Sequence, residues 1–87
     1  MKNFNAKIIV KLKDTIKDVK GLTLKGAVES LLPLQNLSCR VGNFYSLNFL
    51  AENEDEAKNY VDKIAQEILS NGVIETYEIF SIEEIYK

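Results

Sequence analysis

The chain has 87 residues, of which 46% are hydrophobic, and a formal net charge of −2. A chain of this length holds one domain, here residues 1–87, and its apolar content is that of a folded protein. It contains no histidine and a single cysteine, which excludes imidazole catalysis, histidine-ligated metal sites and an internal disulfide. No apolar run approaches the length of a membrane span, and the N-terminus lacks the apolar segment of a signal peptide. We therefore expect a cytoplasmic protein with no membrane contact.

Charge is unevenly distributed along the chain. Residues 1–40 carry eight basic and three acidic side chains, whereas residues 41–87 carry three basic and ten acidic ones. Such asymmetry is typical of a nucleic-acid-binding arm or an acidic tail, but also of complementary faces in one domain or oligomer. The basic residues alternate along a predicted strand and do not cluster, which favours the second explanation.

The first half of the chain predicts a strand and a helix. Residues 4–13 alternate apolar and polar side chains, which indicates a strand with one buried face. A helix follows, with Asp18 as its N-cap and Thr23 as the alternative cap, and Pro33 ends it. The apolar residues expected to face the core recur at helical spacing and are Leu24, Ala27, Val28, Leu31 and Leu32.

Two alternating segments flank the pair Gly42-Asn43. Leu37, Cys39 and Val41 share one face before the pair, and residues 45–51 alternate after it. Because glycine adopts the positive φ of a tight turn, the pattern predicts a β-hairpin centred on this pair. The alternation points Cys39 inward, as a buried structural cysteine rather than a nucleophile.

A second helix and a last strand complete the chain. Asn53 and Glu56 resemble a capping box, and the acidic residues beside them suit a helix N-terminus. Asn71-Gly72 predicts the end of the helix, with the glycine in the left-handed conformation. Residues 73–82 are rich in β-forming residues and apolar on both faces. The apolar stripe of the helix consists of Ala57, Tyr60, Val61, Ile64, Ala65, Ile68 and Leu69.

The order β-α-β-β-α-β is that of an α+β, ferredoxin-like fold, in which two helices cover one face of a four-stranded antiparallel sheet. The other face then has no cover. Its expected residues on the first three strands are Lys7, Ile9, Lys11, Phe44, Ser46, Asn48 and Leu50. The last strand adds apolar side chains whichever way it faces, so the patch is too broad for comfortable exposure on a monomer. We expect self-association through Ile9, Phe44, Leu50, Tyr77 and Phe80.

The chemistry-bearing residues indicate no catalytic site. Cys39 has no histidine to activate it, and the acids of 52–56 are explained by helix capping. No phosphate-binding glycine motif is present. An RNA-binding sheet of this topology would carry stacking aromatics within a basic motif, which the sequence lacks, so we expect no nucleic-acid partner. These residues indicate a non-catalytic interaction domain that self-associates.

Four segments together resemble a known family. They are Val10-Lys11-Leu12-Lys13, Asp18-x-x-Gly21-x-Thr23 with the helix that it opens, the run 39–44, and the run 71–79. Their order and spacing resemble PurS, the small subunit of bacterial phosphoribosylformylglycinamidine (FGAM) synthase, over roughly residues 6–80. The family's usual forms are V-x-L-K-x, D-P-x-G-x-T, V-R-V-G-K and N-P-V-I-E-x-Y-x-I.

The sequence departs from these forms at four positions. Val19 and Gly72 stand where the family has proline, and Asp14 replaces another common proline. Asn43 replaces a basic residue at the turn, which affects any charge contact made there. A helix tolerates valine in its first turn, and glycine is a good helix stop, so the fold expectation stands.

The resemblance implies a non-catalytic subunit of an ATP-dependent, glutamine-using ligase of de novo purine (IMP) biosynthesis. Such a subunit forms a dimer or tetramer, bridges the glutaminase subunit and the large synthetase subunit, and assists ammonia transfer between them. It binds no cofactor itself, while the complex uses ATP, Mg²⁺ and glutamine. By motif position and expected exposure, the candidates for contact with the larger subunits are Asp18, Gly21, Thr23, Arg40, Gly42 and Asn43.

Two other classes remain open. An ACT-like regulatory module has the same element order and binds an amino acid at a dimer interface, but the chain lacks a glycine-containing loop between its first strand and helix. A small stand-alone enzyme would use carboxylates or tyrosines in a cleft between subunits of an oligomer. The role of the acidic residues in helix capping argues against this alternative.

Overall fold

The computed structural model describes residues 1–86. Within these residues the chain forms three strands and two helices, in the order β1 (Lys2–Leu12), α1 (Val19–Leu31), β2 (Gly42–Ala51), α2 (Glu54–Ile64) and β3 (Glu75–Ile85), with a π-helical turn η1 (Ala65–Leu69) continuing α2. The α+β class is therefore as expected, although one predicted strand is missing.

The strands form an antiparallel sheet in the order β2-β1-β3. The central strand β1 pairs with β2 along the full length of β2 and with β3 on its other side. The pairing with β3 shifts between Lys7, which lies opposite Ser81, and Ile8, which lies opposite Ile79. Phe80 is the extra residue of this β-bulge. Since a bulge breaks the alternation of a strand, it explains why the last strand is apolar on both faces.

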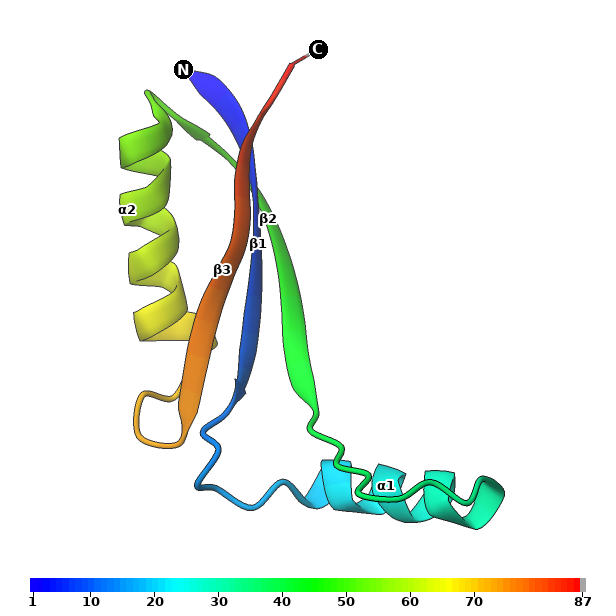
Figure 1. Ribbon diagram of the computed structural model, residues 1–87. Helices are drawn as coiled ribbons and strands as arrows, with labels where there is room; N and C mark the ends of the chain where they lie inside the picture. Colours follow the sequence, from blue (N-terminus) through cyan, green and yellow to red (C-terminus); the bar gives the residue numbers. More distant parts are fainter. Residues whose placement is uncertain (87) are drawn as a thin grey trace.

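The core lies between the sheet and α2, which covers one face (Figure 1). Four of the five predicted inward residues of β1 are buried, namely Phe4, Ala6, Ile8 and Val10, whereas Leu12 at the end of the strand is only partly buried. The four buried residues pack with small or β-branched residues of the helix and with the end of β2: Ala51, Ala57, Val61 and Ala65. These small side chains let α2 approach the sheet closely.

The start of α2 is confirmed and its end differs from expectation. The Asn53 side chain accepts a hydrogen bond from the Glu56 amide at 2.8 Å, and the Glu56 carboxylate accepts one from the Glu52 amide at 3.1 Å. At the other end, no glycine among residues 1–86 has a positive φ, so the predicted left-handed Gly72 is wrong. The Ser70 amide and hydroxyl both donate to the Ala65 carbonyl instead, closing the π-helical turn.

The predicted hairpin at Gly42-Asn43 is wrong, and so is the fourth strand. Residues 37–41 have no regular secondary structure, and Gly42 already belongs to β2, opposite Lys11 of β1. Because β1 supplies a partner for β2 from its first residue, the chain runs straight through the pair. Cys39 lies in this irregular segment and is only partly buried, since the strand that would have turned it inward does not form.

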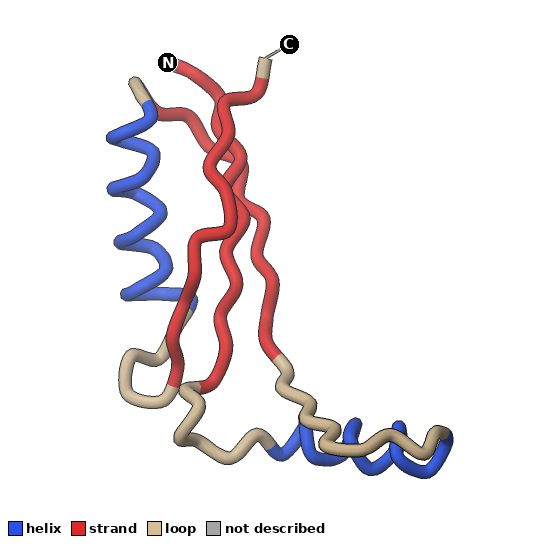
Figure 2. Tube along the Cα trace, in the orientation of Figure 1, coloured by secondary structure: helices blue, strands red, loops and turns tan. Residues whose placement is uncertain are grey.

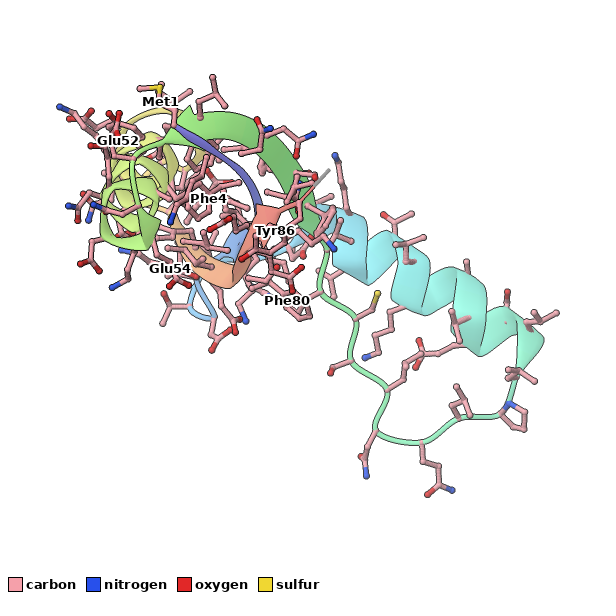
Figure 3. The ribbon with its side chains drawn as sticks, turned by 90° about the horizontal axis from the view of Figure 1, so that it is seen from above. Met1, Phe4, Glu52, Glu54, Phe80 and Tyr86 are labelled. Carbon is pink, nitrogen blue, oxygen red and sulfur yellow. The ribbon has the colours of Figure 1, made fainter. Side chains whose placement is uncertain are left out.

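The first helix does not cover the sheet. Together with its return segment it forms a projection, residues 17–41, which we call the arm (Figures 1 and 2). Seen from above, the arm runs away from the sheet and α2 (Figure 3), and the molecule measures 52 × 31 × 15 Å. The prediction that the α1 stripe is a core face is therefore wrong, because Leu24 is 49% and Leu31 80% exposed. Asp18 as N-cap of this helix is confirmed.

We predict that Ile8→Ala lowers the free energy of unfolding by about 2–5 kcal/mol, since it opens a cavity beneath α2. Ile68→Ala is the matched control, because its side chain is 76% exposed and its loss changes stability by about 0.5 kcal/mol or less. Urea unfolding followed by circular dichroism at fixed chain concentration measures both. Equal effects of the two changes would contradict the placement of the core.

Candidate interaction surfaces

The uncovered side of the sheet, which we call the open face, carries the side chains that the sequence predicted. Pairing in register places Lys7 opposite Ser46 and Ile9 opposite Phe44, on the side away from the buried Ile8 and Val10. Directly opposite residues of an antiparallel pair point to the same side of the sheet. The residues expected on this face from β1 and β2 are therefore confirmed. Its members are Asn3, Asn5, Lys7, Ile9 and Lys11 of β1 and Phe44, Ser46, Asn48 and Leu50 of β2.

Four of the five predicted self-association residues lie on the open face. Phe44 is 60% exposed, Leu50 52% and the bulged Phe80 66%, and Ile9 is Phe44's direct neighbour across the strands. Tyr77 lies on the other face, opposite Val10, and packs against the core. The bulge accounts for this separation, because it turns Phe80 outward while Tyr77, Ile79 and Ile82 all contact the core.

A polar row crosses the middle of the open face. The Asn5 amide nitrogen donates to the Ser46 hydroxyl at 3.0 Å and to the Asn48 side-chain oxygen at 2.7 Å. These bonds fix the orientation of both amides beside the apolar patch. Asn5 is not among the residues predicted to form a contact. Its only signal in the sequence is its polar position in the alternation of residues 4–13.

The base of the arm is organised around one carboxylate. Asp18 is buried, and its two oxygens accept hydrogen bonds from the Val41 amide at 2.6 Å and the Gly21 amide at 2.8 Å. These amide donors, Val41 first, hold the pKa of Asp18 below its ordinary value, and the nearby Arg40 guanidinium adds to this effect. Asp18 thus ties the start of α1 to the residue just before β2.

Arg40 and Gly21 complete this base. The Arg40 guanidinium donates to the Ile16 carbonyl at 2.9 Å and the Lys13 carbonyl at 2.8 Å, which fixes the loop between β1 and α1. A Cβ on Gly21 would collide with the Cys39 carbonyl oxygen, so only glycine permits the return segment to pass this close to the helix.

The structure brings most of the predicted partner-contact residues together. Asp18, Gly21 and Arg40 form the base of the arm, and Gly42 and Asn43 line a hollow of about 300 Å³ beside it, together with Asp18. Thr23 lies apart on α1, exposed, with its hydroxyl donating to the Val19 carbonyl at 3.0 Å.

The side chains of the open face and of the arm are suited to contact with other proteins. Among residues 1–86 no group of three metal-ligating side chains occurs, and no helix in that range is long and apolar enough to cross a membrane. What the open face and the arm offer is exposed apolar area, oriented amides and lysine charge.

The family model described as "PurS: Phosphoribosylformylglycinamidine (FGAM) synthase" matches residues 5–83. The chain belongs to the PurS family. A relative from Thermotoga maritima, the phosphoribosylformylglycinamidine synthase subunit PurS, is 33% identical over 78 residues, which cover 87% of this chain and 93% of the relative.

Solved PurS structures share the fold over nearly the full chain. PurS of Thermus thermophilus superposes with a TM-score of 0.85 and 27% identity, covering 97% of this chain and 99% of that one. A chain in the PurLQS structure of Thermotoga maritima gives a TM-score of 0.79 and 32% identity, covering 98% of this chain and all of the other.

The residues that carried the PurS resemblance now have structural roles. Asp18 and Gly21, of the motif Asp18-x-x-Gly21-x-Thr23, cap α1 and admit the return segment. Arg40 fixes the loop after β1. These three residues are predicted to contact other subunits, and in the structure they build the base of the arm.

We predict that Asp18→Asn loosens the return segment while leaving the helix start in place. The asparagine oxygen still accepts from the Gly21 amide as an N-cap, but its amide group cannot accept from the Val41 amide. Hydrogen exchange should accelerate at least tenfold at the Val41 amide and change little at Gly21. Thr23→Ala, on the exposed side of α1, is the control and should alter neither amide. Unchanged exchange at Val41 in Asp18→Asn would contradict the role of the second carboxylate oxygen.

Proposed function

We propose that the chain is a non-catalytic subunit of FGAM synthase that bridges the glutaminase and synthetase subunits and helps ammonia pass between them. The observation that carries this proposal is the match, over 98% of this chain, to a chain of the PurLQS structure. Family membership over residues 5–83 supports it as well. The proposal includes the cytoplasmic location of purine biosynthesis, with ATP, Mg²⁺ and glutamine held by the larger subunits and none by this chain.

Ammonia transfer gives a physical reason for a subunit of this kind. Ammonia is small, neutral and readily protonated in water, so its direct transfer needs a dry, closed contact between the proteins that release and consume it. An adaptor that presents the same surface twice can seal such a contact, which is why self-association belongs to the proposal.

The open face is the proposed self-contact. Ile9, Phe44 and Phe80 lie close together across the three strands, and Leu50 extends the apolar area toward the end of β2. A patch of this kind is typical of an interaction site on a small protein. The proposal allows two assemblies. One is a dimer formed through the open face, and the other is a tetramer formed through the open face and a second surface. The four-stranded, ferredoxin-like layout that the sequence indicates belongs to the assembled state in this proposal.

The arm is the proposed contact with the larger subunits. Thr23, Gly42 and Asn43 are exposed on it or beside its base, and Asp18, Gly21 and Arg40 hold it in position. Because the arm projects from the sheet (Figure 3), the subunits that it contacts lie away from α2.

A reconstituted reaction tests the bridging role. Purified glutaminase and synthetase subunits are supplied with ATP, Mg²⁺ and formylglycinamide ribonucleotide, with and without this chain, and amidine formation is measured with glutamine or with free ammonium. We expect glutamine-dependent synthesis to require the chain and ammonium-dependent synthesis to require it much less. Equal rates with and without the chain, for both nitrogen sources, would overturn the proposal.

We predict that Phe44→Asp raises the dissociation constant of the oligomer about 30-fold or more, because it places an unpaired charge in an apolar contact worth about 2 kcal/mol. Ile68→Asp is the matched control, since Ile68 is similarly exposed but lies on η1, on the other side of the sheet. Sedimentation over a range of chain concentrations measures both. An Ile68→Asp effect as large as that of Phe44→Asp would place the contact elsewhere.

A further inference from the structure

Two of the segments that carried the PurS resemblance contain charged residues with no role so far. Lys13 closes the first segment, and Glu75 lies in the last one, residues 71–79. The structure brings them together, because the Lys13 amide donates a hydrogen bond to the Ile74 carbonyl at 2.8 Å and so continues the pairing of β1 with β3. Both residues line a hollow of about 520 Å³ between η1 and the start of β3. A hollow of this size is typical of small-ligand sites.

The other polar residues around this hollow, which we call the η1 hollow, come from the π-helical turn and from β3. They are Gln66, Ser70, Thr76 and Tyr77. The Ser70 amide and hydroxyl both bond the Ala65 carbonyl and close the turn. Turns of this kind are rare and are frequent at functional sites. Figure 1 shows the loop after η1 below α2, beside the end of β1, so the turn and the two strand ends bound the hollow together.

Hydrogen bonds of the loop after η1 fix the Glu75 carboxylate at the edge of the η1 hollow. Its Oε1 atom accepts from the Asn71 amide at 2.7 Å, and the Glu75 amide donates to the Asn71 carbonyl at 2.7 Å. The Asn71 side-chain oxygen accepts in turn from the Val73 amide at 3.0 Å. No donor among residues 1–86 bonds the second carboxylate oxygen, Oε2. The carboxylate is therefore oriented and keeps one oxygen for a ligand.

Lys13 and Glu75 line one hollow without pairing with each other. Within the part of the chain that the structure describes, the only ion pair joins Lys2 to Glu84, at 3.8 Å. A ligand with a single negative charge would be attracted by Lys13 and repelled by Glu75, and a single positive charge would meet the converse. A small molecule that carries both charges is attracted by both residues.

We propose that the η1 hollow binds a free α-amino acid. The carboxylate of the amino acid accepts a hydrogen bond from the Lys13 ammonium, and its own ammonium group donates to Glu75 Oε2. Charge-assisted hydrogen bonds of this kind are roughly twice as strong as those between neutral groups. The site is additional to the bridging role and does not depend on it. It also differs from the ACT-like alternative, because it lies within one chain and not between two copies.

The rest of the lining selects the side chain of the amino acid. Gln66 and Thr76 offer an amide and a hydroxyl, and the Ser70 oxygen can still accept a hydrogen bond. Tyr77 packs against the core as well as lining the hollow, so it closes the inner side and limits the length of side chain that fits. A short, uncharged polar side chain suits these groups, as in L-asparagine or L-serine.

Calorimetric titration of the purified full chain with L-asparagine and with L-serine tests the proposal. We expect a single ligand per chain, with a dissociation constant of about 1 mM or lower for the better of the two. Two analogues of L-asparagine each remove one charge. Succinamate lacks the ammonium group, 3-aminopropanamide lacks the carboxylate, and each should bind about tenfold more weakly or worse. These analogues are used with the wild-type chain, so this result is independent of the folding of any variant.

Two variants assign each charge of the ligand to its partner. Glu75→Gln keeps an oxygen for the Asn71 amide, and Lys13→Gln keeps a polar side chain. Each should weaken the binding of L-asparagine about tenfold or more. In Lys13→Gln, removal of the ligand's carboxylate should cost a further factor of only about two or less, since its partner is already absent. Glu78→Gln and Lys58→Gln are the matched controls, because neither residue lines the hollow, and both should bind as the wild type does.

Two results would overturn the amino-acid site. One is the absence of a heat of binding for both amino acids up to about 20 mM. In that case, weaker capture of the glutaminase or synthetase subunit by Lys13→Gln and Glu75→Gln would assign the hollow to a protein contact instead. The other is binding that the two control variants weaken as much as these two do. The reconstituted reaction tests the bridging function separately, so failure of the amino-acid site leaves that function standing.

Discussion

The Asp18 carboxylate joins two segments that are far apart in the sequence, and the shape of the molecule depends on this junction. One oxygen receives the Gly21 amide at the start of α1, and the other receives the Val41 amide just before β2. Arg40 holds the preceding loop through its carbonyls. Both ends of the arm are thus tied at one place, between the end of β1 and the start of β2. The leucines of α1 stay exposed because the arm leads them away from the sheet (Figure 3).

The parts of the fold that the sequence predicts well are those that local pattern determines. The alternation of residues 4–13 and the cap at Asn53 need only neighbouring residues to be understood, and both are confirmed. The composition of the open face follows from the same alternation once β1 and β2 pair. The helix beginning at Asp18 was also predictable, because an N-cap acts within one turn.

The rest depends on contacts between distant residues. A stripe of leucines indicates that one side of α1 packs against another surface, but it does not show whether that surface belongs to the sheet of the same chain. Gly42-Asn43 is compatible with a tight turn and with a straight strand, and pairing of β2 with β1 up to Gly42 decides between them. The bond from Val41 to Asp18 spans 23 positions, and the bulge at Phe80 depends on its pairing with β1, so neither has a local signal. For the same reason Tyr77 could not be separated from Phe80 in advance.

The elongated shape has a thermodynamic consequence. The chain exposes 6522 Å², whereas a compact protein of its mass exposes about 5,200 Å². The excess, about 1,300 Å², is larger than the roughly 800 Å² that one partner contributes to an ordinary interface. A chain with so much surface left to bury has no single intrinsic stability, because its folded population rises with the concentration of whatever covers that surface. Copies that lack a partner are therefore less stable than copies whose exposed surface is covered.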